Sequence, residues 1–125
     1  MNSNIMTIKI KRIYEPFSKS DGYRILVDRL WPRRMKKEDA FIDKWMKEVG
    51  PSNTLRKWFN HDPEKWELFI AKYKAELKGS SAFEELMSVI KKHKIITLTY
   101  SAKDEQYNQA VALRQFIAGK ADPER

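Results

Sequence analysis

The chain has 125 residues, of which 42% are hydrophobic and 34% are charged, and it contains no cysteine. This length and composition predict one globular domain over residues 1–125, and they exclude disulfide bonds, a thiolate nucleophile and sulfur-ligated metal sites. The formal net charge of +8 favours anionic partners, either small ligands or nucleic acid.

Membrane and export signals are missing from the sequence. No apolar run approaches the length of a membrane span, and Met1–Met6 lacks the basic start and apolar stretch of a signal peptide. We therefore expect a cytoplasmic protein without a membrane partner. The sequence does not indicate an oligomeric state.

The N-terminal half predicts two strands and one weak helix. Ile8 and Ile10 alternate with polar residues, which is typical of a half-buried strand. A second strand contains consecutive β-branched and aliphatic residues, and Pro32 ends it because proline cannot donate to a sheet ladder. The predicted elements are a strand at Thr7–Lys11, a loop at Tyr14–Gly22, a central strand at Tyr23–Leu30 and a weakly periodic helix at Lys36–Val49.

The C-terminal half predicts helices around one buried strand. Its predicted elements are a short helix capped by Ser52 and ending at Phe59, an amphipathic helix from Pro63 to Gly79, a helix opened by a capping box at Ser81–Glu84, a strand at Ile95–Tyr100, a helix from Asp104 to Ala118 ended by Gly119, and a frayed tail over 119–125. This order predicts an α/β fold: a small sheet of few, mainly parallel strands flanked by helices.

Two clusters of reactive side chains follow the two most apolar strands. In open α/β sheets ligands bind beyond the carboxyl ends of the strands, so a site is expected there. After the last strand, Ser101 and Lys103 precede the predicted helix, whose N-terminus favours anions. Asp104 would cap this helix, and Asn108, one turn inside it, would point toward the same end. The alternative is that Ser101 and Asp104 only satisfy the helix end.

The other cluster is Asp28–Arg34. On a strand, Asp28 shares a face with leucines, where a carboxylate is costly to bury unless it is paired. Arg29 or Arg33 is the expected partner, in a catalytic arrangement or in a structural bridge. Trp31 would stack on a base or sugar, or pack the loop onto the core. The segment Arg29–Lys37 carries five basic residues and no acidic one.

No cofactor or metal motif accompanies these clusters. The two histidines, His61 and His93, are far apart and lack the spacing of a metal site. The chain has no Walker loop, no GxGxxG and no nucleophile elbow. We therefore expect neither a metal nor a cofactor, and Ser101 without an adjacent histidine does not favour triad chemistry.

The sequence resembles the YeaO-like branch of the bacterial domain of unknown function 488. The resemblance is carried by Lys11–Tyr14, Asp21–Arg33, Pro51-Ser52, Leu55–Phe59 and Leu98–Asp104, and the string Val-Asp-Arg-Leu-Trp-Pro-Arg at residues 27–33 is its most specific part. The resemblance covers most of the chain and implies a compact α/β domain with no established activity.

Two departures from the family pattern bear on chemistry. The family usually has Arg-Gly after Trp-Pro, where this chain has Arg33-Arg34, and it often has Asn-His-Ala where this chain has Asn108-Gln109-Ala110. A role for that histidine therefore cannot be transferred. Distant relatives place a cysteine and a glutamate near the positions of Ser101 and Lys103, so a thiolate mechanism is unavailable here.

Three functional hypotheses follow. The first is a pocket for a small anionic or nucleotide-like ligand that would support hydrolysis or transfer, and it leaves open whether the protein is an enzyme. Its candidate catalytic residues are Asp28 and Ser101, and its candidate ligand-binding residues are Arg29, Trp31, Arg33, Tyr100, Lys103, Asp104 and Asn108. The second is a nucleic-acid-binding module that uses the basic segment Arg29–Lys37 together with Lys91–Lys94. The third is a structural protein without chemistry.

Overall fold

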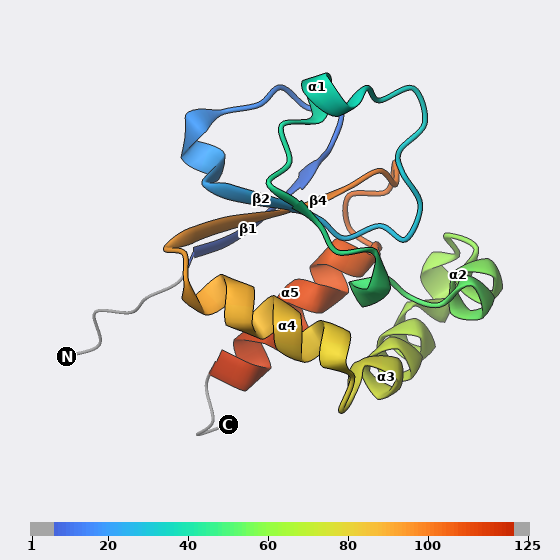
Figure 1. Cartoon of the computed structure of the whole chain (residues 1–125). Coiled ribbons are helices and arrows are strands. Elements are labelled where there is room, and N and C mark those ends of the chain that lie inside the picture. Colours follow the sequence, from blue (N-terminus) through green and yellow to red (C-terminus); the bar gives the residue numbers. More distant parts are fainter. Residues whose placement is uncertain (1–6, 122–125) are drawn as a thin grey trace.

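The computed structural model describes residues 7–121 (Figure 1) and has an α/β architecture built on one parallel sheet. The strands are β1 (Thr7–Arg12), β2 (Tyr23–Leu26), β3 (Lys44–Trp45) and β4 (Ile95–Tyr100), in the order β1-β4-β2-β3. The helices are α1 (Lys37–Ala40), α2 (Asn53–Phe59), α3 (Trp66–Leu77), α4 (Ser81–Lys91) and α5 (Gln109–Ala121), with short 3-10 turns η1 (Lys19–Asp21), η2 (Lys47–Val49) and η3 (Pro63–Lys65). Within this described range no helix is both long and apolar enough to cross a bilayer.

The centre of the sheet is β4, which is parallel to β1 on one side and to β2 on the other. All of β4 except Ile95 is buried, as its β-branched sequence predicts for a strand covered on both faces. The predicted β1 is confirmed and continues to Arg12. The predicted β2 is too long at its end, because it pairs only as far as Leu26. Its outer neighbour β3 has two residues, so the ladder on that side is short.

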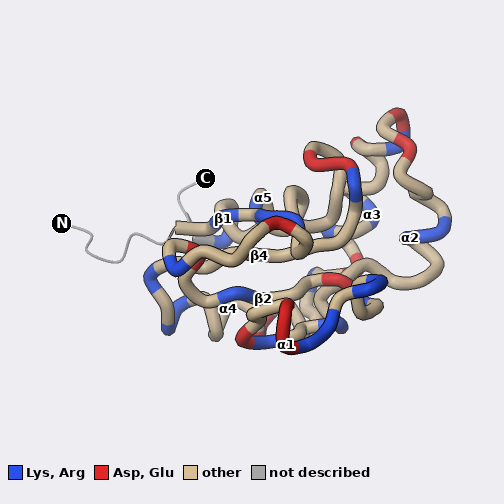
Figure 2. The backbone as a smooth tube through the Cα atoms, turned by 90° about the horizontal axis from the view of Figure 1, so that it is seen from above, with Lys and Arg blue, Asp and Glu red and all other residues tan. Residues whose placement is uncertain are grey.

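The two faces of the sheet are covered differently (Figure 1). Helices α4 and α5 pack beneath the sheet, and apolar side chains such as Ile25, Val27 and Leu98 join the main hydrophobic core there. The opposite face carries Arg24 and Thr97 and is covered by the loop after β1 and the segment around α1. Figure 2 looks down on this second layer, where basic and acidic stretches are interspersed.

Helix starts and ends follow the local capping chemistry. Ser52 caps α2 through its hydroxyl, as the sequence predicts. Asp62 with Pro63 opens the turn η3, and the amphipathic helix predicted from Pro63 begins three residues later, at Trp66. The capping box predicted at Ser81 is wrong by one residue, because the Ser80 hydroxyl accepts from Phe83 N. Helix α5 continues through Gly119 to Ala121, so its predicted end at Gly119 is wrong. Residues 122–125 of the predicted frayed tail lie outside the described part.

The predicted helix at Lys36–Val49 is wrong. Only one turn, α1, forms; Phe41 then adopts a left-handed backbone (φ 51°) that ends it. The chain next enters β3, where Trp45 pairs with Leu26 of β2. Sheet pairing thus overrides the weak helical periodicity of this segment. The loop predicted at Tyr14–Gly22 is confirmed, with η1 as a single turn inside it.

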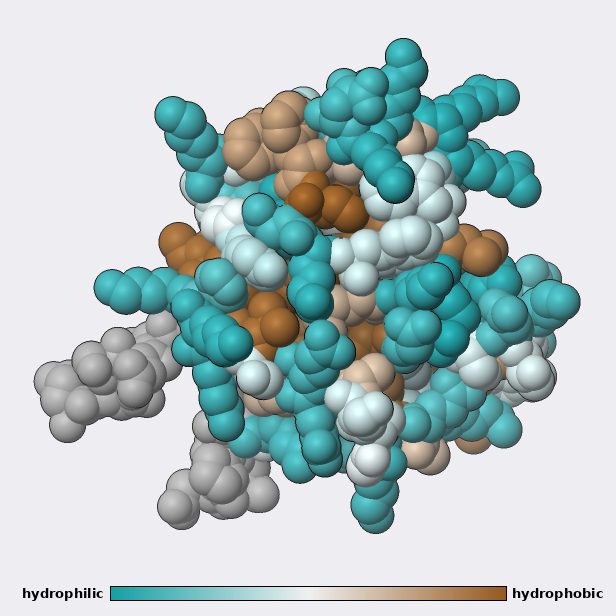
Figure 3. All heavy atoms as spheres, viewed as in Figure 1, coloured by the Kyte–Doolittle hydropathy of each residue, from teal (hydrophilic) through white to brown (hydrophobic). Residues whose placement is uncertain are grey.

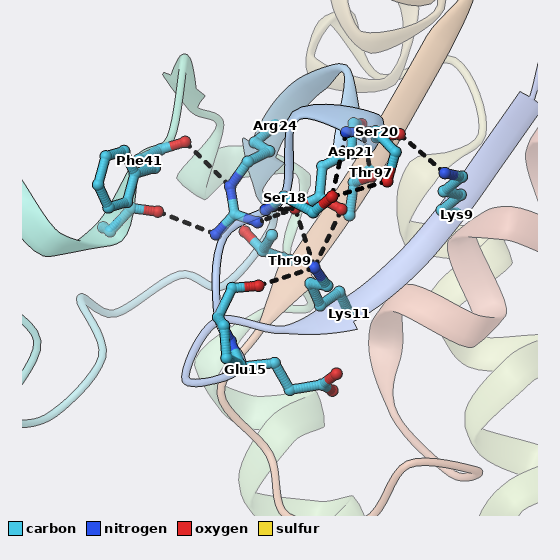
Figure 4. Close-up of polar contacts among 12 residues, drawn as sticks. Lys9, Lys11, Glu15, Ser18, Ser20, Asp21, Arg24, Phe41, Thr97 and Thr99 are labelled. Atoms are coloured by element: carbon cyan, nitrogen blue, oxygen red, sulfur yellow. Dashed lines mark hydrogen bonds and ion pairs between the residues drawn. The ribbon is translucent and has the colours of Figure 1, made fainter.

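A buried ionic network fixes the second layer to the sheet (Figure 4). The Arg24 side chain is 1% exposed, and its guanidinium donates to Asp21 (2.5 Å) and to the carbonyls of Ala40 (3.0 Å) and Phe41 (2.9 Å). Lys11 also pairs with Asp21, at 3.0 Å. Burial acts to raise the pKa of Asp21, but hydrogen bonds from Lys11, the backbone and Arg24 outweigh it and hold that pKa below 3.8.

We expect Arg24→Met to lower the free energy of unfolding by about 3 kcal/mol or more, because it leaves buried carbonyls and a carboxylate with fewer donors. Chemical denaturation measures this change. Arg33→Met, which alters an exposed side chain, is the matched control and should change stability by less than about 0.5 kcal/mol.

Because the pKa of Asp21 is lowered, the contribution of Asp21 to the free energy of unfolding is present at neutral pH and is lost as the pH falls below 3.8. Equal stabilities of the two variants would contradict this role for Arg24.

Candidate ligand site at the carboxyl ends of β2 and β4

The neighbouring strands β2 and β4 run in the same direction, as predicted, and the chain leaves them in opposite directions. After β2 it proceeds to β3 at one edge, whereas after β4 it enters α5, which packs on β4 and on β1 at the other edge. In open α/β sheets ligands usually bind outside the carboxyl ends of strands at such a divergence. The two clusters singled out in the sequence lie at these strand ends.

Asp28 joins the two strand ends. It lies two residues beyond β2, is 7% exposed, and its carboxylate Oδ2 accepts the backbone N–H of Ser101 at 2.9 Å. Its other oxygen, Oδ1, accepts the side-chain amide of Gln109, the first residue of α5. The backbone carbonyl of Asp28 accepts the indole N–H of Trp45 at 2.7 Å. A single residue thus connects the end of β2 to β3, β4 and α5.

The electrostatic environment of Asp28 is unfavourable for its charge. Burial raises its pKa above 3.8, and hydrogen bonds from Ser101 and Gln109 and the positive charge of Arg56 offset this only in part. Among residues 7–121, no lysine, arginine or histidine nitrogen lies within 4.0 Å of its carboxylate. The site therefore holds a buried carboxylate that is hydrogen-bonded but has no ion pair.

The predicted pairing of Asp28 with Arg29 or Arg33 is wrong. Arg29 follows Asp28 directly, and successive side chains of an extended chain point to opposite sides. The Arg29 guanidinium donates to the carbonyls of Gly50 (2.9 Å) and Pro51 (3.0 Å) and so fixes this loop to the segment before α2. The side chain of Arg33 is exposed, and its backbone carbonyl accepts the hydroxyl of Tyr14 at 2.7 Å.

The segment Ser101–Asn108 is a loop, and α5 begins after it. Asp104 does not cap α5, because its carboxylate accepts the N–H groups of Gln106 and Tyr107 and closes a local turn. Asn108 is the cap. Its side-chain oxygen Oδ1 accepts the N–H of Val111, and its side-chain amide nitrogen Nδ2 donates to the backbone carbonyl of Asp104. The sequence therefore misplaced the helix start by more than one turn, since Asp and Asn both suit caps and turns.

The remaining candidates divide between the site and its support. Ser101 lies against Asp28, and Lys103 follows it with an exposed side chain. Tyr100 is buried; burial raises the pKa of its hydroxyl, which hydrogen bonds to Asn108. Trp31 packs edge-on against Trp45 at 5.3 Å and donates to Met35 O, an arrangement that fits the packing alternative.

Three contributors were missed by sequence reasoning. Gln109 contacts Asp28 directly, and Arg56 acts on its charge. Arg12, at the end of β1, donates to the carbonyls of Ser101 (3.1 Å) and Ala102 (2.8 Å) and holds the loop after β4. Arg12 and Arg56 lie in stretches that carry the family resemblance, and Gln109 stands where the family often has histidine, but no residue pattern indicates that the three come together with Asp28.

This arrangement can accept hydrogen bonds but lacks a proton-transfer partner. The Gln109 amide donates hydrogen bonds but does not gain or lose a proton near neutral pH, so it cannot act as an acid or a base. His93 stacks on Tyr23 at the opposite end of β2, and His61 lies in the turn after α2 beside Phe59. Across the described residues, no group of three or more histidine or acidic side chains is arranged to hold a metal ion.

Comparisons with known proteins agree with the resemblance found in the sequence. The family model described as the inactive DUF488-N3 subclade matches residues 7–125. The uncharacterised Escherichia coli protein YeaO is 44% identical over 112 residues, which cover 90% of this chain and 97% of YeaO. The uncharacterised proteins Rv3073c of Mycobacterium tuberculosis and Mb3100c of Mycobacterium bovis are each 34% identical over 113 residues, covering 90% of this chain and 95% of theirs. No solved structure matches. The chain therefore belongs to the DUF488 family, in its YeaO-like branch.

Proposed function

We propose that this protein is a cytoplasmic ligand-binding domain that holds a small hydroxylated anion, such as a sugar phosphate or nucleotide, at the carboxyl ends of β2 and β4. In this role Asp28 accepts a ligand hydroxyl, as acidic residues near such strand ends accept ribose hydroxyls. Lys103 and Arg56 neutralise the anionic part of the ligand. Ser101 and Asn108 frame the site from the β4 side.

The observation that carries the proposal is the state of Asp28. A buried carboxylate without an ion pair costs folding free energy, and its raised pKa reflects that cost. A purely structural residue in this place would gain more stability as an amide or as one half of an ion pair. Groups whose pKa is perturbed by burial in a crevice are characteristic of functional sites.

The cations near Asp28 and Ser101 support an anionic ligand. Lys103 is exposed beside Ser101, and the charge of Arg56 acts on the same carboxylate. The guanidinium groups of Arg29 and Arg12 donate to backbone carbonyls. We therefore assign these two residues to positioning the loops rather than to ligand binding. Trp31 is likewise assigned to packing.

Binding without turnover is the mode that the chemistry supports. Asp28 contacts an amide and a serine, and neither side chain exchanges a proton readily near pH 7. The matching family model is itself described as an inactive subclade. The wider hypothesis of hydrolysis or transfer would need a proton carrier that the ligand itself brings.

The second hypothesis, a nucleic-acid-binding surface made of Arg29–Lys37 and Lys91–Lys94, is less well supported than the ligand site. The first segment begins beyond the carboxyl end of β2, whereas the second precedes the amino end of β4. The six residues of β4 separate these ends by roughly 20 Å. A single short contact surface would have to bridge the length of the sheet.

Asp28→Asn tests whether this carboxylate is functional or structural. The amide keeps an acceptor for Ser101 N–H, and rotation of the Gln109 amide restores the second hydrogen bond. Because the pKa of Asp28 is raised in the folded protein, ionisation destabilises the wild type at pH 7, and this penalty fades as the pH falls toward 3.8. We expect the variant to be at least as stable as the wild type at pH 7, with the difference shrinking in acid, as measured by denaturation at several pH values. A loss of about 2 kcal/mol or more at pH 7 would assign Asp28 a structural role.

Thermal denaturation with inorganic phosphate, ribose 5-phosphate and adenosine monophosphate tests the ligand class. At ten times Kd, binding contributes about 1.4 kcal/mol and raises Tm by roughly 4 °C. We expect the hydroxylated phosphates to act at lower concentrations than phosphate alone, and Lys103→Gln to weaken all three. Lys92→Gln, an exposed residue before the opposite end of β4, is the matched control. The absence of a Tm shift with every probe would contradict the proposal. Equal Tm shifts in the Lys103→Gln variant and the wild type would contradict it as well.

A further inference from the structure

A second surface, separate from the ligand site, presents aromatic rings to solvent. Tyr14, Phe17 and Phe41 are 39%, 43% and 53% exposed, and we call them the aromatic patch. Phe17 and Phe41 stack with ring centroids 4.6 Å apart and an interplanar angle of 19°. Figure 3 shows hydrophobic atoms in the upper part of that face, near the position of α1, bordered by long hydrophilic side chains.

The fold holds Phe41 in an unusual state. Its φ of 51° lies in the left-handed region, which is unfavourable for a bulky side chain and suits glycine or asparagine better. Buried Arg24 fixes this conformation by donating to the carbonyls of Ala40 and Phe41 (Figure 4). Its guanidinium also lies 5.5 Å from the Phe17 ring centroid. The Phe17 ring thus contacts both the Arg24 guanidinium and the Phe41 ring. The Phe41 ring remains open to solvent. Backbone strain that maintains an exposed aromatic ring indicates a functional surface.

Positive charge lies beside the aromatic patch. Arg33, Arg34, Lys36 and Lys37 are exposed and have no carboxylate among them, whereas the exposed carboxylates near the patch, Glu15, Glu38, Asp39 and Asp43, lie in the loop after β1 and in or after α1. The Tyr14 hydroxyl donates to the Arg33 carbonyl at 2.7 Å, which ties this basic segment to the loop that carries Phe17. Lys37 and Phe41 flank the single turn of α1, so they are separated along its axis by roughly 6 Å. In Figure 2 the basic stretch leads directly into α1.

We propose that the aromatic patch and residues 33–37 bind single-stranded nucleic acid. A base stacks on the open ring of Phe41, and the neighbouring phosphates contact Arg34, Lys36 and Lys37. Stacking platforms beside positive charge are the general means of binding single strands, because every base offers a flat face whatever the sequence. This surface uses one basic segment only, so it avoids the separation that weakens the wider nucleic-acid hypothesis. It does not depend on the ligand site at Asp28.

Fluorescence anisotropy with a labelled 12-nucleotide oligouridine and a hairpin duplex of equal charge tests this proposal. We expect preference for the single strand and affinity that falls with salt. Phe41→Asn removes the ring but suits the left-handed backbone, so it should fold with an unchanged or higher Tm and bind about tenfold more weakly. Lys36→Glu with Lys37→Glu should abolish binding. Lys91→Glu with Lys92→Glu makes the same change in net charge before the amino end of β4 and should reduce affinity much less.

Several results would overturn the proposal. Absence of oligouridine binding at low salt would do so, as would a preference for the duplex. Unchanged affinity in folded Phe41→Asn would show that the ring is not a platform. An equal loss in the two double lysine variants would show attraction by net charge alone, with no surface on this side of the sheet.

Discussion

The parallel pairing of β2 with β4 is the constraint on which the candidate site depends. Its register places Leu26 opposite Thr99, so Asp28 and Ser101 leave the sheet together. The chain then diverges toward β3 and toward α5, and Asp28 remains between the two paths. Hydrogen bonding in the sheet therefore brings together two segments that are 73 residues apart in sequence. The chemistry of the site follows from that neighbourhood rather than from any local motif.

The two buried aspartates among residues 7–121 show what a structural carboxylate and a candidate functional carboxylate look like in one fold. Asp21 has Lys11 and Arg24 as partners, and its pKa is lowered. Asp28 has amide and serine partners, and its pKa is raised. Asp21 thus adds stability at neutral pH, whereas Asp28 subtracts it. The same fold thus supplies cations to one buried carboxylate and leaves the other without an ion pair.

Sequence patterns were sufficient where one physical effect dominates. The Ile95–Tyr100 strand, the Ser52 cap and the carboxyl-end location of the two polar clusters could all be predicted from residue types and spacing. Patterns failed where effects compete. Lys36–Val49 has weak helical spacing, but pairing of Trp45 with Leu26 prevails. Asp104 and Asn108 are equally good caps in sequence, and only the hydrogen bonds distinguish the turn from the helix start. The departure at Gln109 from the family histidine marked that position, but the contacts of Gln109 with Asp28 and of Arg12 with the loop after β4 are set by tertiary structure and could not be predicted.

The most direct test of this account is a carbon-13 nuclear magnetic resonance titration of the Asp28 side-chain carboxyl group in the folded protein. A buried carboxylate with no ion pair should titrate with a midpoint above 3.8, and Gln109→Ala should raise that midpoint further by removing a hydrogen bond to the charged form. A midpoint at or below 3.8 would mean that Asp28 is well solvated or paired with a cation, and the proposed site would lose its central feature.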